Sequence, residues 1–178
     1  MLTYPVWTQS WPIPELQQLD RESNLILKDN CGHHPLGTTD LLYLARKHGG
    51  RGLKSVESTY KAFKVKTAIK LYSSEDPTMH MVREFEEECE RTGGRSLKKD
   101  AERYAFERGL HLKLSYPCPF ANTEEGEKLH GKKVGAMMRI KEEESRTKEV
   151  RQQKWQGKLI EARWDDADVI GCFSWLRR

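Results

Sequence analysis

The sequence predicts a mainly α-helical fold with one short β element near residues 110–116 and a long charged helix toward the C-terminus. Proline, serine and glycine stand at the ends of several segments with helical periodicity. Hydrophobic residues make up 37% of the 178 residues and charged residues 33%, which suits a core surrounded by long solvated helix faces. Only residues 110–116 alternate strictly between apolar and polar, as a half-buried strand does.

The first predicted helix runs from Pro14 to about Asn30, because three early prolines exclude helix before that point and proline suits a first turn. Gly32 ends it. The apolar run at 41–46 is too short to be assigned to strand or helix. The glycine cluster at 49–52 predicts a turn, since glycine adopts positive φ and lets another backbone come close.

Ser55 is the expected N-cap of the next helix. At 100° per residue its apolar side chains form two stripes, with lysines between them. The first stripe contains Val56, Tyr60, Phe63, Thr67 and Leu71, and the second contains Ala62, Val65, Ile69 and Tyr72. We therefore expect this helix to pack between two neighbours.

Two shorter helices follow, one from Asp76 and Pro77 to Gly93 and one from Ser96 to Gly109. The strand at 110–116 comes next. After a loop, a periodic and highly charged segment predicts a helix from Glu127 to Trp164, about 60 Å long if straight. We expect two domains, residues 1–109 and 110–178.

Positive charge is concentrated in residues 31–72, where eight Lys and Arg face two acidic residues. Basic side chains beside backbone amides freed by glycine suit phosphate contacts. The alternative is that a packed helix solvates its edges with lysine. The candidate nucleic-acid-binding residues are Arg46, Lys47, Gly49, Gly50, Arg51, Lys54, Lys61, Lys64, Lys66 and Lys70.

The sequence predicts no metal site, no cofactor and no catalytic residues. Cys31, His33 and His34 lack the second ligand cluster that a structural zinc site needs. Asp165 and Asp166 follow a long helix and are interpreted as its C-terminal turn. Phosphate-loop, nucleophile-elbow and zinc-protease motifs are absent, and the five tryptophans are assigned to packing.

The sequence also predicts the cellular compartment of the protein. The four cysteines are far apart, which favours reduced thiols in an intracellular protein. No apolar run approaches the roughly 20 residues that cross a bilayer, and the start of the chain lacks a signal-peptide pattern. We expect a cytoplasmic or nuclear protein without membrane contact.

The order of residues in LLYLARKHGGRGLKSVESTYKAFKVKTAIKLY resembles the segment after the polymerase palm in reverse transcriptases of non-LTR retrotransposons. There an apolar stretch, a basic pair and Gly-Gly-x-Gly-Leu lead into a thumb helix. The similarity extends upstream through YPVWTQSWPIPELQQLDRESNLILKDNCGHHPLGTTD and downstream through LYSSEDPTMHMVREFEE to KWQGKLIEARWDD. Its most specific part is Gly49 to Leu53 with the following helix.

The resemblance implies a helical thumb-like bundle with a downstream connector, without fingers or palm. The aromatic-x-Asp-Asp turn on which the family's polymerase activity depends is missing, so we expect no polymerase activity from this chain and a truncated or remnant product. The family's thumb grips the template–primer duplex, which implies backbone contacts to RNA or an RNA/DNA duplex. The alternative is a helical module, without nucleic-acid binding, that organises a protein partner or self-association through the two-striped helix and the long charged helix.

Overall fold

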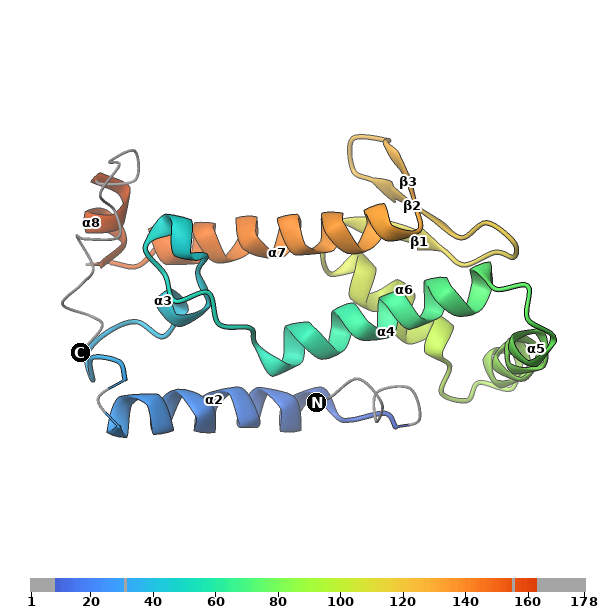
Figure 1. Ribbon diagram of the computed structural model, residues 1–178, viewed down its shortest axis with the longest axis horizontal. Helices are drawn as coiled ribbons and strands as arrows, with labels where there is room; N and C mark the ends of the chain where they lie inside the picture. The colour runs from blue at the N-terminus through green and yellow to red at the C-terminus, as the bar shows by residue number, and fades with distance from the viewer. Residues whose placement is uncertain (1–8, 31, 155, 163–178) are drawn as a thin grey trace. The chain divides into compact units, whose positions relative to one another are not determined.

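The computed structural model describes residues 9–30, 32–154 and 156–162. It confirms a mainly helical fold with a small antiparallel sheet (Figure 1). The chain divides into two compact units. Unit 1 comprises the described residues of 1–10 and 59–141, and unit 2 those of 11–58 and 142–178. The strand after residue 109 therefore belongs to the same unit as the helices before it, which differs from the expected boundary at 109/110.

Unit 2 begins with helix α2, Ile13–Asp29, which confirms the helix predicted around Pro14. The undecided apolar run becomes a single helical turn, α3, Asp40–Tyr43, followed by a 3₁₀ turn, η1, Arg46–His48. Leu41, Leu42 and Leu44 are buried and form the core of this segment.

Helix α4, Val56–Ser73, begins in unit 2 and continues into unit 1. Ser55 is its N-cap as predicted, since its Oγ accepts from the Ser58 amide at 3.2 Å. The Asp20 carboxylate on α2 adds a second cap by accepting from the Val56 and Glu57 amides at 2.7 and 3.2 Å. Both predicted apolar stripes contribute buried residues, among them Tyr60 and Leu71 on one and Val65, Ile69 and Tyr72 on the other.

Helices α5, Pro77–Arg91, and α6, Leu97–Phe106, confirm the next two predicted helices and are capped by Asp76 and Ser96. Helix α5 turns a polar face inward. The buried Arg83 donates to the Leu71 and Ser74 carbonyls at 2.8 and 2.7 Å, at the end of α4. Its apolar residues Val82 and Phe85 are exposed instead.

A three-stranded antiparallel sheet follows α6, with strands β1, Leu110–Lys113, β2, Phe120–Thr123, and β3, Lys128–His130. The predicted strand at 110–116 is present but shorter, and the other two strands were not predicted. Leu110 and Leu112 of β1, Ala121 of β2 and Leu129 of β3 are buried. Figure 1 shows α6 beside this sheet.

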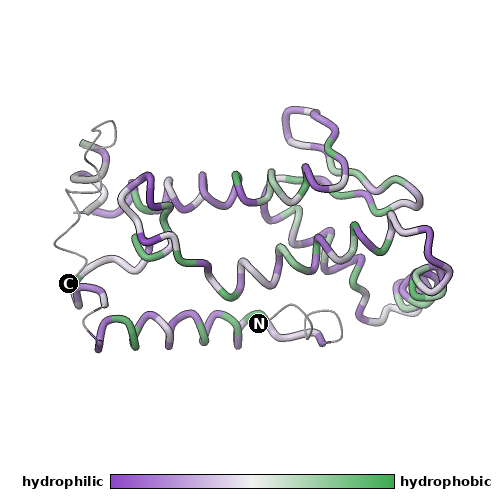
Figure 2. Tube along the Cα trace, viewed as in Figure 1, coloured by the Kyte–Doolittle hydropathy of each residue, from purple (hydrophilic) through white to green (hydrophobic). Residues whose placement is uncertain are grey.

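The prediction of a single helix from Glu127 to Trp164 is wrong. Residues 128–130 form β3, and Gly131, with φ 51°, precedes α7, Lys132–Arg151. A separate helix, α8, covers Gln156–Ala162. Charged residues cover most of α7 (Figure 2), so its pattern gave no sign of either end, although the predicted Glu142–Arg146 pair is present at 2.8 Å.

No helix in the part of the chain that the structure describes is long and apolar enough to span a bilayer. Cys89 and Cys118 carry free thiols. Eight residues to which the sequence analysis assigned a role lie outside the described residues. They are Trp7, Cys31, Trp155, Trp164, Asp165, Asp166, Cys172 and Trp175.

Candidate nucleic-acid interface

The glycine turn of unit 2 folds tightly back on the segment before it. The amides of Gly50, Arg51, Gly52 and Leu53 donate to carbonyls of residues 41–45 at 2.8–3.2 Å. Gly49 has φ 80°, a left-handed conformation that favours glycine. The turn is therefore held by backbone hydrogen bonds to a segment whose leucines are buried.

Position 50 requires glycine because there is no room for a Cβ, and not because of its backbone dihedral angles. A Cβ at this position would lie 2.1 Å from the Leu44 carbonyl oxygen and 2.6 Å from the Leu44 Cβ. Only glycine allows the two backbones to come this close. Gly49 and Gly50 are both buried, so neither presents its backbone to a ligand.

This geometry corrects the expectation that glycine frees backbone amides for phosphate. The Gly49 amide donates to the Arg46 carbonyl, and the next four amides are also engaged within the turn. Any anion at this place is therefore bound by side chains, and the glycines fix the backbone that carries them.

The basic side chains of unit 2 surround this turn. Arg46 is exposed and its Nε donates to the Arg51 carbonyl at 3.3 Å, while Arg51 is partly exposed and Lys54 exposed. Among the described residues, no carboxylate forms an ion pair with Arg46, Arg51 or Lys54. Lys47 is exposed, and its ammonium lies 2.9 Å from a buried carboxylate oxygen of the part-exposed Glu143.

His48 contributes little positive charge to this surface. Burial, followed by the neighbouring Lys47 charge, lowers its pKa below the ordinary value of 6.5, although Glu143 opposes the shift. The lowered pKa favours the neutral imidazole at pH 7. The positive potential of the turn comes from its arginines and lysines.

The candidate lysines of α4 lie in unit 1 and differ in availability. Lys61 forms an ion pair with Glu107 at 2.5 Å. Lys64 is only 6% exposed, and its ammonium donates to the Gln9 carbonyl at 3.1 Å and lies over the Tyr60 ring. Lys66 and Lys70 are exposed. Lys64 is thus part of the packing, and the ten candidates divide between the two units.

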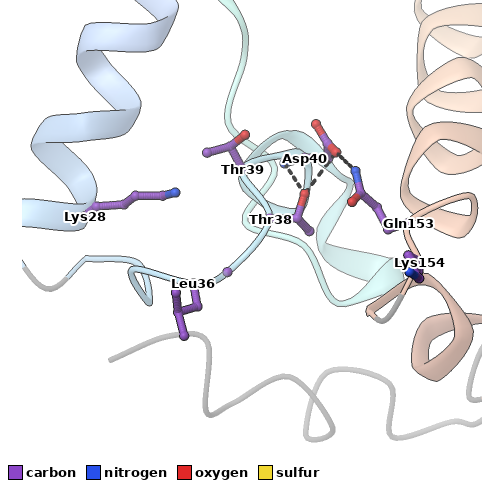
Figure 3. A pocket seen from close by; sticks show the side chains of 8 residues that line it. Lys28, Leu36, Thr38, Thr39, Asp40, Gln153 and Lys154 are labelled. Atoms are coloured by element: carbon purple, nitrogen blue, oxygen red, sulfur yellow. Dashed lines mark hydrogen bonds between the residues drawn. The ribbon is translucent and has the colours of Figure 1, made fainter.

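Unit 2 also contains a polar cavity of about 420 Å³ (Figure 3). Its one carboxylate, Asp40, already accepts from Thr38 Oγ1 at 3.0 Å and from Gln153 Nε2 at 2.7 Å. Lys28 and Lys154 supply two ammonium groups to the lining. The cavity has the chemistry for a small anion. Sequence reasoning missed it because residues 153 and 154 are more than 100 positions away from the rest of its lining. The lining residues are Lys28, Leu36, Gly37, Thr38, Thr39, Asp40, Gln153 and Lys154.

The ring of His33 is enclosed within unit 2. Its Nε2 lies 3.1 Å from the Thr38 carbonyl oxygen, and the ring is 2% exposed. Within the described ranges, no group of three or more His, Cys, Asp and Glu side chains is arranged to hold a metal ion.

Comparison of the chain with protein-family models, with curated proteins and with solved structures finds no match.

Proposed function

We propose that this protein binds nucleic acid through the phosphate backbone and that the basic residues of the glycine turn make the contacts. The observation that carries the proposal is the grouping of Arg46, Arg51 and Lys54 around one turn without carboxylate partners among the described residues. Cations that are not neutralised internally attract a polyanion by releasing its counterions. The Lys47 side chain is exposed, so its ammonium can exchange the Glu143 carboxylate for a phosphate.

The rigidity of the turn supports the same proposal. Its amides are hydrogen-bonded to residues 41–45 and its glycines leave no space for movement toward Leu44. The basic side chains therefore start from a fixed backbone, which lowers the entropic cost of placing them on successive phosphates. Such contacts position a protein on a duplex without reading its sequence.

The proposal extends to the origin of the chain. We infer a fragment corresponding to the region after the palm of a non-LTR retrotransposon reverse transcriptase, which grips template–primer nucleic acid and has no polymerase activity of its own. Its support is the order of residues from Leu41 to Tyr72, together with a mainly helical fold in which the glycine turn leads into α4. RNA or an RNA/DNA duplex is the expected partner.

The test is fluorescence anisotropy with a labelled RNA/DNA duplex, titrated over a series of salt concentrations. The variant Arg46→Ala/Arg51→Ala/Lys54→Ala removes the three cations without touching a buried group. If each contacts one phosphate, the slope of log K against log salt falls by roughly 2 to 3 units, at about 0.9 per phosphate. A matched control, Lys132→Ala/Lys133→Ala/Arg139→Ala, removes the same charge from exposed positions of α7.

Absence of duplex binding at low salt, or equal slopes for both triple variants, would refute the proposal. Lys61 and Lys64 are left unchanged because their pairing with Glu107 and the Gln9 carbonyl makes them part of unit 1's packing. Their replacement would mix loss of stability with loss of binding.

The alternative function, a helical interaction module, stays a hypothesis. The structure buries most apolar side chains of α4, including Tyr60, Val65 and Ile69, whereas the sequence of α7 is rich in charged residues. Light scattering at increasing protein concentration tests self-association directly. Assembly that grows with concentration, combined with no binding of nucleic acid, would favour the alternative.

A further inference from the structure

The three-stranded sheet of unit 1 has one buried face and one solvent face. Leu110, Leu112, Ala121 and Leu129 are buried on one side. Since side chains alternate along a strand, the residues between them point to the other side. Figure 1 shows α6 next to the sheet.

The strand register arranges the solvent face in two rows. His111 pairs with Asn122, which pairs with Lys128, and Lys113 pairs with Phe120, which pairs with His130. Each row crosses all three strands. Phe120 therefore lies on the central strand, with a basic or imidazole side chain on each side.

Aromatic rings continue across this face. The Phe120 and His130 rings have centroids 6.1 Å apart, and the largely exposed Phe106 at the end of α6 meets His111 edge-on at 5.4 Å. The ammonium of Lys128 lies 3.9 Å from the Phe120 centroid. Four rings and two lysines thus lie on this face or at its edge.

The charged residues that the strands place on this face are both lysines. None of its six strand residues is acidic, and Lys113 and Lys128 are both exposed. The nearest carboxylates in sequence lie at two borders of the face. Glu107 follows Phe106 and forms an ion pair with Lys61. Glu124, Glu125 and Glu127 belong to the turn between β2 and β3, beyond the row that contains Lys128. The row formed by Lys113, Phe120 and His130 is the one farther from that turn.

We propose that this face is a stacking platform for single-stranded nucleic acid. A base stacks on Phe120 and a second on the neighbouring His130 ring, while Lys113 and Lys128 contact the phosphates on either side. Lys128 leaves the ring and moves onto a phosphate when a base takes its place. Aromatic platforms bordered by lysine bind single strands with little sequence preference, because every base has a π-face.

A duplex does not fit the same surface, because its bases are stacked within the helix and present no free face to Phe120. A protein partner would favour an apolar centre, whereas this face alternates aromatic, imidazole, amide and ammonium groups. The proposal does not rest on the glycine turn, which belongs to the other unit and is proposed to contact a duplex backbone.

The experiment measures the anisotropy of a fluorescein-labelled oligouridine of about ten nucleotides and, in parallel, of the RNA/DNA duplex. Phe120→Ala is expected to weaken oligouridine binding about tenfold, as removal of one stacking aromatic does. Phe120→Trp is expected to retain binding, and Phe120→Leu to lose as much as alanine, because leucine keeps apolar bulk but has no π-face. The matched control is Phe85→Ala, which removes an exposed phenylalanine from α5.

Lys113→Ala tests the phosphate contact with an exposed side chain whose replacement does not disturb the core. It should reduce the salt slope for oligouridine by about 0.7, the value for one phosphate of a single strand. Circular dichroism verifies that each variant keeps the helix content of the parent.

The outcomes separate the two proposals. Loss of oligouridine binding in Phe120→Ala with unchanged duplex binding supports the platform, and the reverse pattern is expected of the Arg46/Arg51/Lys54 variant. The platform is refuted if the parent binds oligouridine more weakly than about 10⁻⁴ M, if Phe120→Leu binds like the parent, or if Phe120→Ala weakens both ligands equally. The proposal would also be refuted if Phe120→Ala binds oligouridine as the parent does but loses the binding of a protein partner, because the face would then belong to that partner.

Discussion

Replacing Gly50 by alanine tests whether the glycine turn is a fixed scaffold. The new Cβ would lie 2.1 Å from the Leu44 carbonyl oxygen, and backbone at this distance cannot be relieved by a rotamer change. Residues 50–52 must move away from Leu44, which is fully buried. That movement breaks the hydrogen bonds from the Gly50 amide to Ala45 and from the Gly52 amide to Leu44, now 3.2 and 2.8 Å long.

The expected cost follows from these two effects. Two hydrogen bonds contribute about 1 kcal/mol each, and overpacking adds about 1–3 kcal/mol. Gly50→Ala should therefore lower the free energy of unfolding by about 3–5 kcal/mol. Gly52→Ala is the matched control. Its Cβ would meet nothing closer than the flexible Arg46 side chain at 3.3 Å, so its cost comes mainly from the positive φ of 68°, about 1–2 kcal/mol.

Urea denaturation followed by far-ultraviolet circular dichroism measures both variants. With an m-value of about 1–3 kcal/mol per molar urea, a difference of 2 kcal/mol separates the two midpoints by about 1 M. If Gly50→Ala is no more destabilising than Gly52→Ala, the close approach to Leu44 does not constrain the turn, and the argument for preplaced basic side chains loses its basis.

Two further predictions concern unit 2. Asp20→Ala should lower the free energy of unfolding by about 1–3 kcal/mol, because the Asp20 carboxylate accepts hydrogen bonds from the Val56 amide and from Ser55 Oγ, both at 2.7 Å. Urea denaturation of this variant and of Asp20→Asn measures the loss, and a loss below 0.5 kcal/mol would contradict the capping role. Burial lowers the pKa of His33 below its ordinary value of 6.5, so the unfolded chain takes up a proton that the folded chain resists, and stability present above pH 6.5 declines as the pH falls below it. Denaturation midpoints between pH 7.5 and 5.5 should fall less in His33→Gln than in the parent, and parallel curves would refute this.

The helices could be predicted because their ends are marked by local chemistry. Pro14 lies in the first turn of α2, and Ser55, Asp76 and Ser96 cap α4, α5 and α6 as their positions predict. The end of a helix depends on groups within a few residues, so the sequence contains the information. The same rule failed for α7, where an even charge distribution hides Gly131 and the end at Arg151.

The facing of α5 could not be predicted, because distant groups determine it. Its periodic apolar residues normally mark the side that packs, yet Val82 and Phe85 are exposed. Two polar side chains orient the helix instead. Arg83 donates hydrogen bonds to two carbonyls at the end of α4, and Glu86 accepts one from the Leu97 amide at 2.7 Å. An amphipathic pattern predicts a helix, but the partners of its polar groups decide which side faces the core.

The role of a basic residue is even harder to predict from the sequence. A count of lysines and arginines does not distinguish side chains that are available to a ligand from those that pack inside the protein. Lys64 belongs to the most basic segment of the chain, but its ammonium is buried against the Gln9 carbonyl, 55 residues away. Lys128 lies in a segment expected to be helical, where it would be one more surface charge. The pairing of β2 with β3 instead places it over Phe120, and the pairing of β1 with β2 brings Lys113 beside the same ring. Strands of three or four residues have too little periodicity to predict this arrangement, so a possible binding surface emerges only when their register is known.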